Sequence, residues 1–280
     1  MMAKPSDRIR LQLLGLPTID SLQDLSSLTH ISEGLIFRLC KFSDHFYKTY
    51  EIKKKRGGVR NIAQPSCEMK ALQGWILRNL LDRLHVSSAA KGFEKQSGIL
   101  DNASPHRGSN AVLCIDLEDF FPSIKINQVW SVFRTVGYSA KISATLASMC
   151  CFQGRLPQGA PTSPKLANLV SLRLDRRLLG FVGKKSIVYT RYADDLTFSG
   201  LSVSKLVACF HFIRFIVDSE GFKINEDKTR LAGPARQHRI TGLVLNDENV
   251  GIGRKKLKKL RAEILGLAFK PACLIEETCK

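Results

Sequence analysis

The sequence lacks any hydrophobic run long enough to cross a membrane. No stretch of about 18 consecutive apolar residues occurs along the chain. The N-terminus carries four charged residues, Lys4, Asp7, Arg8 and Arg10. A secretory signal would have an apolar core there. Both absences argue against a membrane protein, and we expect a cytoplasmic one.

Cysteine pairs with metal-ligand spacing are also missing. The eight cysteines are scattered apart from the neighbours Cys150 and Cys151, and no Cys-x-x-Cys pair occurs. This pattern argues against a zinc site or a disulfide framework and favours reduced thiols in the core. The chain also has no internal repeat and no low-complexity linker. We therefore expect one core with subdomains.

Acidic residues are scarce compared with basic ones. The chain has 25 Asp and Glu against 43 Lys and Arg, which gives a formal net charge of +18. Such a chain is expected to bind polyanions, because neutralising phosphates releases counterions and supplies affinity independent of sequence. Nucleic acid is the favoured partner, since no apolar segment supports membrane binding.

Two of the few acidic residues are adjacent, in the segment TRYADDLTFS that covers residues 190–199. Apolar and β-prone residues flank Asp194 and Asp195 on both sides, which predicts two short strands joined by a tight turn with both carboxylates at its tip. Like charges this close raise the pKa of one carboxyl, and a polyvalent cation removes that repulsion. A solvated acidic turn is the alternative.

A third carboxylate follows a predicted buried strand. Residues 111–115 (AVLCI) are continuously apolar and β-prone, and Asp116 comes directly after them. Magnesium prefers oxygen ligands and keeps substrate phosphates among them, so Asp116, Asp194 and Asp195 on neighbouring strands could hold a pair of ions. For Asp116 alone, a helix N-cap is the alternative.

These segments resemble the palm motifs of reverse transcriptases. The matching segments, in order, are the strand ending in Asp116, LPQGAPTSP at 156–164, YADD at 192–195, and GFKIN to Lys228-Thr229 at 221–229. The chain most resembles the bacterial retron reverse transcriptases. NASPH at 102–106 fits their Asn-Ala-x-x-His signature, and Ile240-Thr241-Gly242 is similar to their Val-Thr-Gly triplet. The resemblance runs from about residue 8 to about residue 265.

The resemblance implies an α+β, right-hand polymerase fold with fingers, a palm made of an antiparallel sheet with helices, and a short helical thumb. The implied domains are an N-terminal helical extension (1–35), fingers with the Asn-Ala-x-x-His segment (36–110), a palm with the catalytic motifs and a finger-like insertion (111–235), and a primer-grip strand with a truncated thumb (236–280). Relatives commonly continue through more thumb helices, so a partner protein could complete this one.

The resemblance also implies the residues that carry the chemistry. Two Mg²⁺ ions, or Mn²⁺ as an alternative, would be bound by Asp116, Leu117, Asp194 and Asp195. Lys228 would act with the three aspartates in catalysis, close to the leaving pyrophosphate, and Lys223 is its rival. A surface lysine is the alternative for both.

Four residues are implied as nucleotide contacts. Arg60 would bind the triphosphate from the basic turn of a hairpin at 53–60, for which a solvated turn is the alternative. Phe121 would lie under the sugar and exclude a 2′-hydroxyl, unless it only packs in the core. Gln158 and Gly159 would lie over the nucleotide, unless their segment is only a rigid turn before a helix at 165–179.

Contacts to RNA and primer are implied for a further set. These residues are Asn102, His106, Ile240, Thr241, Gly242, Arg254, Lys255 and Lys258. Residues 239–245 are expected to form one strand, and the last three of the set lie on a basic helix that could face nucleic acid backbone. A solvated helix face is the alternative for that helix.

The implied function is RNA-directed DNA polymerisation, a nucleotidyl transfer. The substrates would be dNTPs and a structured noncoding RNA that serves as template and primer, and the product would be branched, RNA-linked multicopy single-stranded DNA (msDNA). An effector protein from the same locus and a role in anti-phage defence belong to the same expectation. The alternatives are a reverse transcriptase of the group II intron or diversity-generating type, and a non-catalytic RNA-binding scaffold.

Overall fold

The centre of the protein is a four-stranded antiparallel sheet with the strand order β4-β5-β3-β6. The computed structural model describes residues 5–53, 57–245 and 249–268. The strands are β3 (Ala111–Leu117), β4 (Val188–Tyr192), β5 (Asp195–Gly200) and β6 (Ile224–Ala232). From Leu113 onward the side chains of β3 alternate between buried and partly exposed positions, so one face of the sheet packs in the main core. On the other face Cys114 and Asp116 are partly exposed, whereas Val112 packs in a second small core.

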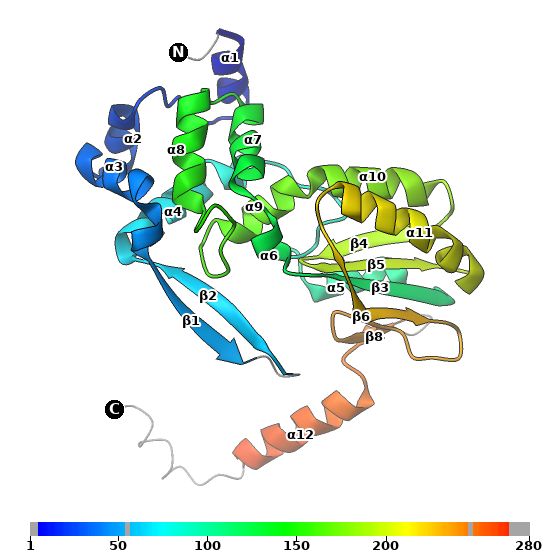
Figure 1. The fold of residues 1–280 in the computed structure, drawn as a ribbon. Coiled ribbons are helices and arrows are strands. Elements are labelled where there is room, and N and C mark those ends of the chain that lie inside the picture. Colours follow the sequence, from blue (N-terminus) through cyan, green and yellow to red (C-terminus); the bar gives the residue numbers. More distant parts are fainter. Residues whose placement is uncertain (1–4, 54–56, 246–248, 269–280) are drawn as a thin grey trace.

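Two helices cover the buried face of this sheet (Figure 1). They are α10 (Leu172–Gly183) and α11 (Val203–Ser219), and α11 packs on β3, β5 and β6. The single helix expected at 165–179 is wrong, because α9 (Ser163–Val170) ends at Ser171 and α10 begins anew. The backbone at Ser171 has ψ 0°, and the break separates α9, which is buried nearly all round, from α10, which is buried along one face only.

Helices fill the N-terminal side of the molecule (Figure 1). They are α1 (Pro5–Leu13), α2 (Leu22–Thr29), α3 (Glu33–Lys41), α4 (Cys67–Asn79), α7 (Ile126–Val136) and α8 (Ala140–Cys150). The helical character expected for residues 1–35 is confirmed over the described part, and α3 runs past residue 35. Ser21 caps α2 because its hydroxyl accepts from the Asp24 amide while Asp24 accepts from the Ser21 amide. The Tyr138 hydroxyl ties this region together by donating to the Pro17 carbonyl at 2.9 Å.

A two-stranded hairpin projects from the helices (Figure 1). Strand β1 (Tyr47–Lys53) pairs antiparallel with β2 (Val59–Pro65), with Lys53 opposite Val59. This confirms the hairpin expected from the glycine-containing basic turn. Residues 54–56 of that turn lie outside the described part of the chain.

The last part of the chain forms a small sheet followed by a helix. The strands are β7 (Arg239–Ile240), β8 (Leu243–Leu245) and β9 (Val250–Gly251), and the helix is α12 (Arg254–Ala268). The single strand expected at 239–245 is wrong: Thr241 (φ 46°) and Gly242 (φ 83°) are both left-handed and turn the chain back into a hairpin. Helix α12 lies on the side of the central sheet opposite α10 and α11 (Figure 1).

Short segments complete the connections. They are the helices α5 (Ile99–Ala103) and α6 (Phe120–Ser123) and the 3-10 turns Ser43–Phe46, Leu81–Arg83 and Ser104–His106. The described helices include none that is both long and apolar enough to span a membrane.

Candidate active site

The three predicted catalytic aspartates meet at one end of the central sheet. Asp116 lies near the end of β3 and is the register partner of Asp195 at the start of β5. Asp194 lies in the turn between β4 and β5, and the Leu117 amide donates to its carbonyl at 2.9 Å. The turn itself depends on Ala193, which adopts a left-handed backbone (φ 58°). The hairpin tip expected for the Asp-Asp pair is therefore confirmed.

The carboxylates destabilise one another in their ionised forms. Burial, followed by the charge of Asp116, raises the pKa of Asp194. Burial and then the charges of Asp194 and Asp116 raise the pKa of Asp195 to about 6. Asp195 remains exposed to solvent, so screening weakens this effect. A cation bound at this place would relieve the repulsion.

Lys228 on β6 already supplies a positive charge to the cluster. Its Nζ lies 3.0 and 2.9 Å from the two carboxylate oxygens of Asp116. The Asp116 side chain is only 13% exposed whereas that of Lys228 is 54% exposed, so the lysine can leave the pair without unfolding anything. The rival Lys223 has an exposed side chain, and its backbone carbonyl accepts from the Glu118 amide.

The chemistry of this cluster suits magnesium. It offers carboxylate oxygens whose raised pKa values a divalent cation would lower. The Leu117 side chain is 2% exposed and belongs to the core, so only its backbone could serve as a ligand. Among the described residues no group of three His, Cys, Asp or Glu side chains is already arranged around a metal-sized space. In this structure the Asp116 carboxylate forms an ion pair with Lys228 instead.

A cavity of about 550 Å³ opens beside Asp194. It is lined by Arg60, Ile62, Lys70, Phe93, Phe120, Phe121, Gln158, Gly159, Ala160, Pro161, Ser163, Pro164, Ala193 and Asp194. All four residues expected to contact the nucleotide, Arg60, Phe121, Gln158 and Gly159, are in this set. The sequence analysis did not identify Lys70 and Phe93, because no motif marks either residue.

Gly159 lies where the loop at 156–164 contacts the β1–β2 hairpin. The Ala63 amide donates to the Gln158 carbonyl at 2.8 Å. Gly159 has φ 122°, and an added Cβ would lie 2.9 Å from the Ala63 carbonyl oxygen and 3.1 Å from Ile62 Cγ2. No other residue type fits there without moving the loop.

Gly159→Ala is therefore expected to raise the KM for dNTPs roughly tenfold, because displacing the loop from β2 costs on the order of 1–3 kcal/mol. Steady-state primer extension measures this. Gly154→Ala is the matched control, since Gly154 also has positive φ (70°) but an added Cβ meets nothing within 4 Å. Equal KM values for the two variants would contradict the expectation.

Three of the residues expected to contact RNA are buried. Asn102 and His106 have 0% exposure, and Ile240 has 1% in a small core with Leu243 and Leu245. These side chains offer no surface for a direct contact in this structure, so RNA contact by the three residues stays a prediction. The sequence carried no burial signal for the polar pair, since asparagine and histidine are mostly exposed or half-buried residues.

His106 instead bonds the β4–β5 hairpin. Its Nδ1 lies 2.7 Å from Ser199 Oγ on β5, and its Nε2 lies 2.7 Å from Thr190 Oγ1 on β4. Burial lowers the pKa of His106 to about 4, so the ring is neutral at pH 7. The imidazole thus bonds both strands of the hairpin that carries Asp194 and Asp195.

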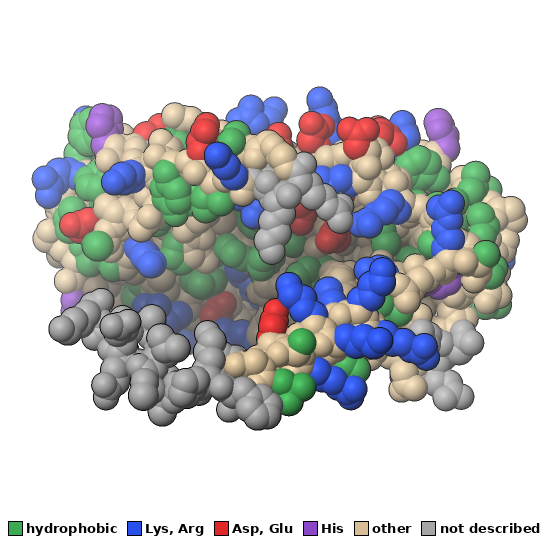
Figure 2. Space-filling model, turned by 90° about the horizontal axis from the view of Figure 1, so that it is seen from below, with side chains coloured by type: hydrophobic (Ala, Val, Ile, Leu, Met, Phe, Trp, Pro, Cys, Tyr) green, Lys and Arg blue, Asp and Glu red, His purple; other side chains and the backbone are tan. Residues whose placement is uncertain are grey.

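The other residues of the expected RNA-binding set lie at the surface. Thr241 is partly exposed, and Gly242, Arg254, Lys255 and Lys258 are exposed. In the view from below, Lys and Arg side chains gather on the surface formed by α12, next to a hollow in the molecule (Figure 2). These positions are accessible to a nucleic acid backbone.

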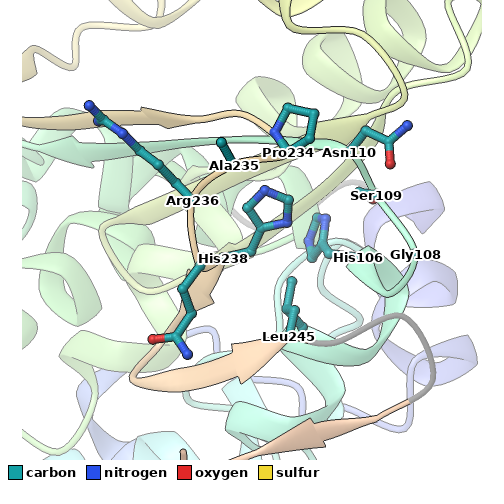
Figure 3. Close-up of a pocket in the computed structure, with 10 residues that line it drawn as sticks. His106, Gly108, Ser109, Asn110, Pro234, Ala235, Arg236, His238 and Leu245 are labelled. Atoms are coloured by element: carbon teal, nitrogen blue, oxygen red, sulfur yellow. The ribbon is translucent and has the colours of Figure 1, made fainter.

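A second cavity, of about 670 Å³, lies away from the carboxylates. It is lined by residues from the segments 106–110 and 234–238 and by Leu245 (Figure 3). None of its lining residues is acidic, so this larger cavity is not the place where the three aspartates act.

Sequence comparisons identify the family. A family model described as "Reverse transcriptase (RNA-dependent DNA polymerase)" matches residues 52–268. Retron Ec86 reverse transcriptase from Escherichia coli is 50% identical over 257 residues, which cover 91% of this chain and 80% of that protein. Retron Mx65 reverse transcriptase from Myxococcus xanthus is 37% identical over 281 residues, which cover 91% of this chain but only 65% of that protein.

Two telomerase structures share the fold. Apo telomerase from Candida tropicalis aligns with a TM-score of 0.51 and 10% identity, over 73% of this chain and 47% of that one. Telomerase from Candida albicans aligns with a TM-score of 0.51 and 15% identity, over 80% of this chain and 51% of that one. These likenesses confirm the α+β polymerase fold. The family model and the sequence relatives establish that the chain belongs to the reverse transcriptases, as a member of the retron family.

Proposed function

We propose that this chain copies a structured noncoding RNA into RNA-linked msDNA. The observation that carries the proposal is the position of Asp194, which belongs to the carboxylate cluster and also lines a nucleotide-sized cavity. Two cations, Arg60 and Lys70, line the cavity and could bind a triphosphate. This combination suits polymerisation, whereas a scaffold would need only a basic surface.

The chain's residues divide the work of nucleotidyl transfer. Two Mg²⁺ bound by Asp116, Asp194, Asp195 and the Leu117 backbone would activate the primer hydroxyl and neutralise the triphosphate. Arg60 and Lys70 would bind the triphosphate, and Gln158 and Gly159 would orient the base. Lys228 would leave Asp116 for the leaving pyrophosphate, where its charge stabilises the oxygens released.

The domain limits proposed for this chain are those that the likeness to reverse transcriptases implies, and helix α3 (Glu33–Lys41) crosses the first of them. We assign residues 1–35 to an N-terminal extension, 36–110 to the fingers, 111–235 to the palm, and 236–280 to the primer grip and thumb. The packing of α8 on α3 and α4 supports the view that α7 and α8 are a finger-like insertion in the palm. Residues 269–280 of the thumb lie outside the described part of the chain.

The basic surface of the chain suits binding to an RNA partner. The net charge of +18 and the exposed cations of α12 suit binding to RNA backbone and to the DNA product. The priming from an internal 2′-hydroxyl, an effector protein and a role in anti-phage defence belong to this proposal through the likeness to retron reverse transcriptases alone.

Phe121→Ala is expected to increase ribonucleotide incorporation. The ring of Phe121 is partly buried in the cavity, 5.8 Å from the ring of Phe93 and 5.5 Å from that of Phe120. Removing it opens space for a 2′-hydroxyl, so the preference for dNTPs over NTPs should fall by about tenfold to a hundredfold. Competition between the two nucleotide types in primer extension measures it.

Phe93→Ala is the control for lost apolar surface in the same cavity. It should weaken the binding of both nucleotide types and leave the sugar preference unchanged. Unchanged sugar preference in Phe121→Ala would refute the role of its ring.

The function itself is tested by expressing the protein together with the flanking DNA of its locus and then purifying the protein. The expected result is co-purifying DNA that stays attached to RNA until a debranching enzyme is added, and that is absent from an Asp194→Asn preparation. Unbranched DNA would point to another priming mode, and RNA alone in both preparations would support the scaffold alternative.

A further inference from the structure

We propose that Arg191 is a positioning residue that holds the catalytic turn in its active geometry. The inference rests on the proposed polymerase function. Arg191 lies on β4, three residues before Asp194, and its side chain is 0% exposed. Burying a guanidinium costs several kcal/mol unless every donor is paired, so such a residue requires an explanation.

Asp175 on α10 neutralises this charge. Arg191 Nε donates to Asp175 Oδ1 at 2.9 Å, and Nη2 donates to Asp175 Oδ2 at 2.7 Å. This two-pronged pairing fixes the plane of the guanidinium. The Tyr189 hydroxyl also donates to Asp175, at 2.8 Å, so the carboxylate is fixed in turn. The pair thus anchors β4 to α10 and leaves one arginine nitrogen, Nη1, free to act elsewhere.

Nη1 reaches the catalytic turn. It donates to the Ala193 carbonyl at 3.2 Å and to Asn168 Oδ1 at 3.0 Å. The next carbonyl along the chain, that of Asp194, accepts from the Leu117 amide. Two successive carbonyls are therefore held, one by Arg191 and the other by β3. Because Ala193 is in the left-handed region, this hold keeps an unfavourable backbone in place and sets the direction of the Asp194 side chain.

The same network extends to the nucleotide cavity. Asn168 Nδ2 donates to the Gly92 carbonyl at 2.8 Å, and the backbone of Arg191 exchanges bonds with Ala89 and Lys91. The segment 89–92 is thereby laid along β4, directly before Phe93 of the cavity wall. The fit is tight, since a Cβ on Gly92 would lie 2.6 Å from the Ala193 amide nitrogen. Arg191 therefore couples the carboxylate turn to the nucleotide site.

The alternative is that the Arg191–Asp175 pair only stabilises the fold. A double replacement separates the two roles. Arg191→Met alone leaves an unpaired buried carboxylate and is expected to lower stability strongly. Arg191→Met with Asp175→Asn removes both charges and keeps an acceptor for Tyr189, so thermal stability should recover by a large part. The donor to Ala193 is still missing in this double variant.

Positioning predicts that the double variant stays impaired after its stability recovers. The kcat for primer extension should be about tenfold to a hundredfold below wild type, with KM for dNTPs changed much less. Amide hydrogen exchange of residues 192–196, measured without substrate, should be faster than in wild type. A kcat that recovers together with stability, or exchange at the wild-type rate, would overturn the proposal.

A matched control removes another ion pair of α10. Arg177 pairs with Glu220 at the end of α11, away from the turn, and Arg177→Met with Glu220→Gln is expected to leave kcat and the exchange of residues 192–196 unchanged. If wild-type protein made no DNA, the polymerase function would fail separately. The exchange measurement would still decide whether Arg191 holds the turn.

Discussion

DNA synthesis by an Asp194→Asn variant is expected to fall about a hundredfold to a thousandfold below wild type. Asp194 belongs to the carboxylate cluster and also lines the cavity proposed to bind the nucleotide. A neutral amide at this position therefore weakens metal binding where the charge of the triphosphate must be offset. Primer extension at saturating dNTP measures the loss.

The same variant should be at least as stable as wild type. Burial and the nearby Asp116 charge raise the pKa of Asp194, which means that its ionised form is disfavoured in the folded protein. A neutral asparagine removes that penalty, and thermal unfolding would detect the gain.

Asp119→Asn is the control. Asp119 is exposed and lies three residues from Asp116, yet its side chain makes no hydrogen bond within the described residues. It should keep activity and stability close to wild type. Substantial synthesis by Asp194→Asn, or a loss of its stability, would contradict this account of the site.

A second large effect is expected in the pH dependence of stability. The folded protein keeps His106 neutral down to a pKa of about 4, because burial disfavours the imidazolium, whereas the unfolded chain binds a proton near 6.5. Below pH 6.5 the unfolded state binds a proton at His106 that the folded state does not bind. The contribution of His106 to the free energy of unfolding is therefore full above about pH 6.5 and is lost as the pH falls toward 4. The free energy of unfolding should drop by about 2 kcal/mol between about pH 7.5 and about pH 5, from this residue alone.

His106→Gln isolates the effect. Glutamine keeps a donor and an acceptor for Ser199 and Thr190 but does not titrate. The raised pKa values of Asp194 and Asp195 act in the opposite direction, because they favour the folded state at low pH. Comparing the pH slopes of wild type and variant in urea unfolding removes that shared contribution.

The exposed His85 provides the matched control, since His85→Gln should retain the wild-type slope. Identical slopes for wild type and His106→Gln would show that the imidazole does not resist protonation in the fold.

Local interactions made parts of the fold predictable. The apolar run before Asp116 gave β3, and the β-prone residues around Asp194 and Asp195 gave a hairpin with both carboxylates in its turn. Turn residues and strand patterns act over a few neighbours, so a single segment contains the information. The break at Ser171 and the turn at Thr241 escaped prediction because similar stretches form continuous elements when packing does not require otherwise.

The sequence by itself determined the chemistry: three carboxylates in motifs of known order, a strongly basic chain, and the residues suited to a nucleotide. Only the tertiary structure decided which of these side chains reach solvent and which reach one another. Lys228 pairs with Asp116 across 112 positions, and His106, which was expected to contact RNA, is buried against the β4–β5 hairpin. The role proposed for Arg191 depends on its pairing with Asp175 on α10, which the sequence does not show. The physical reason is that burial and charge pairing depend on segments distant in sequence, and these determine which side chains can act.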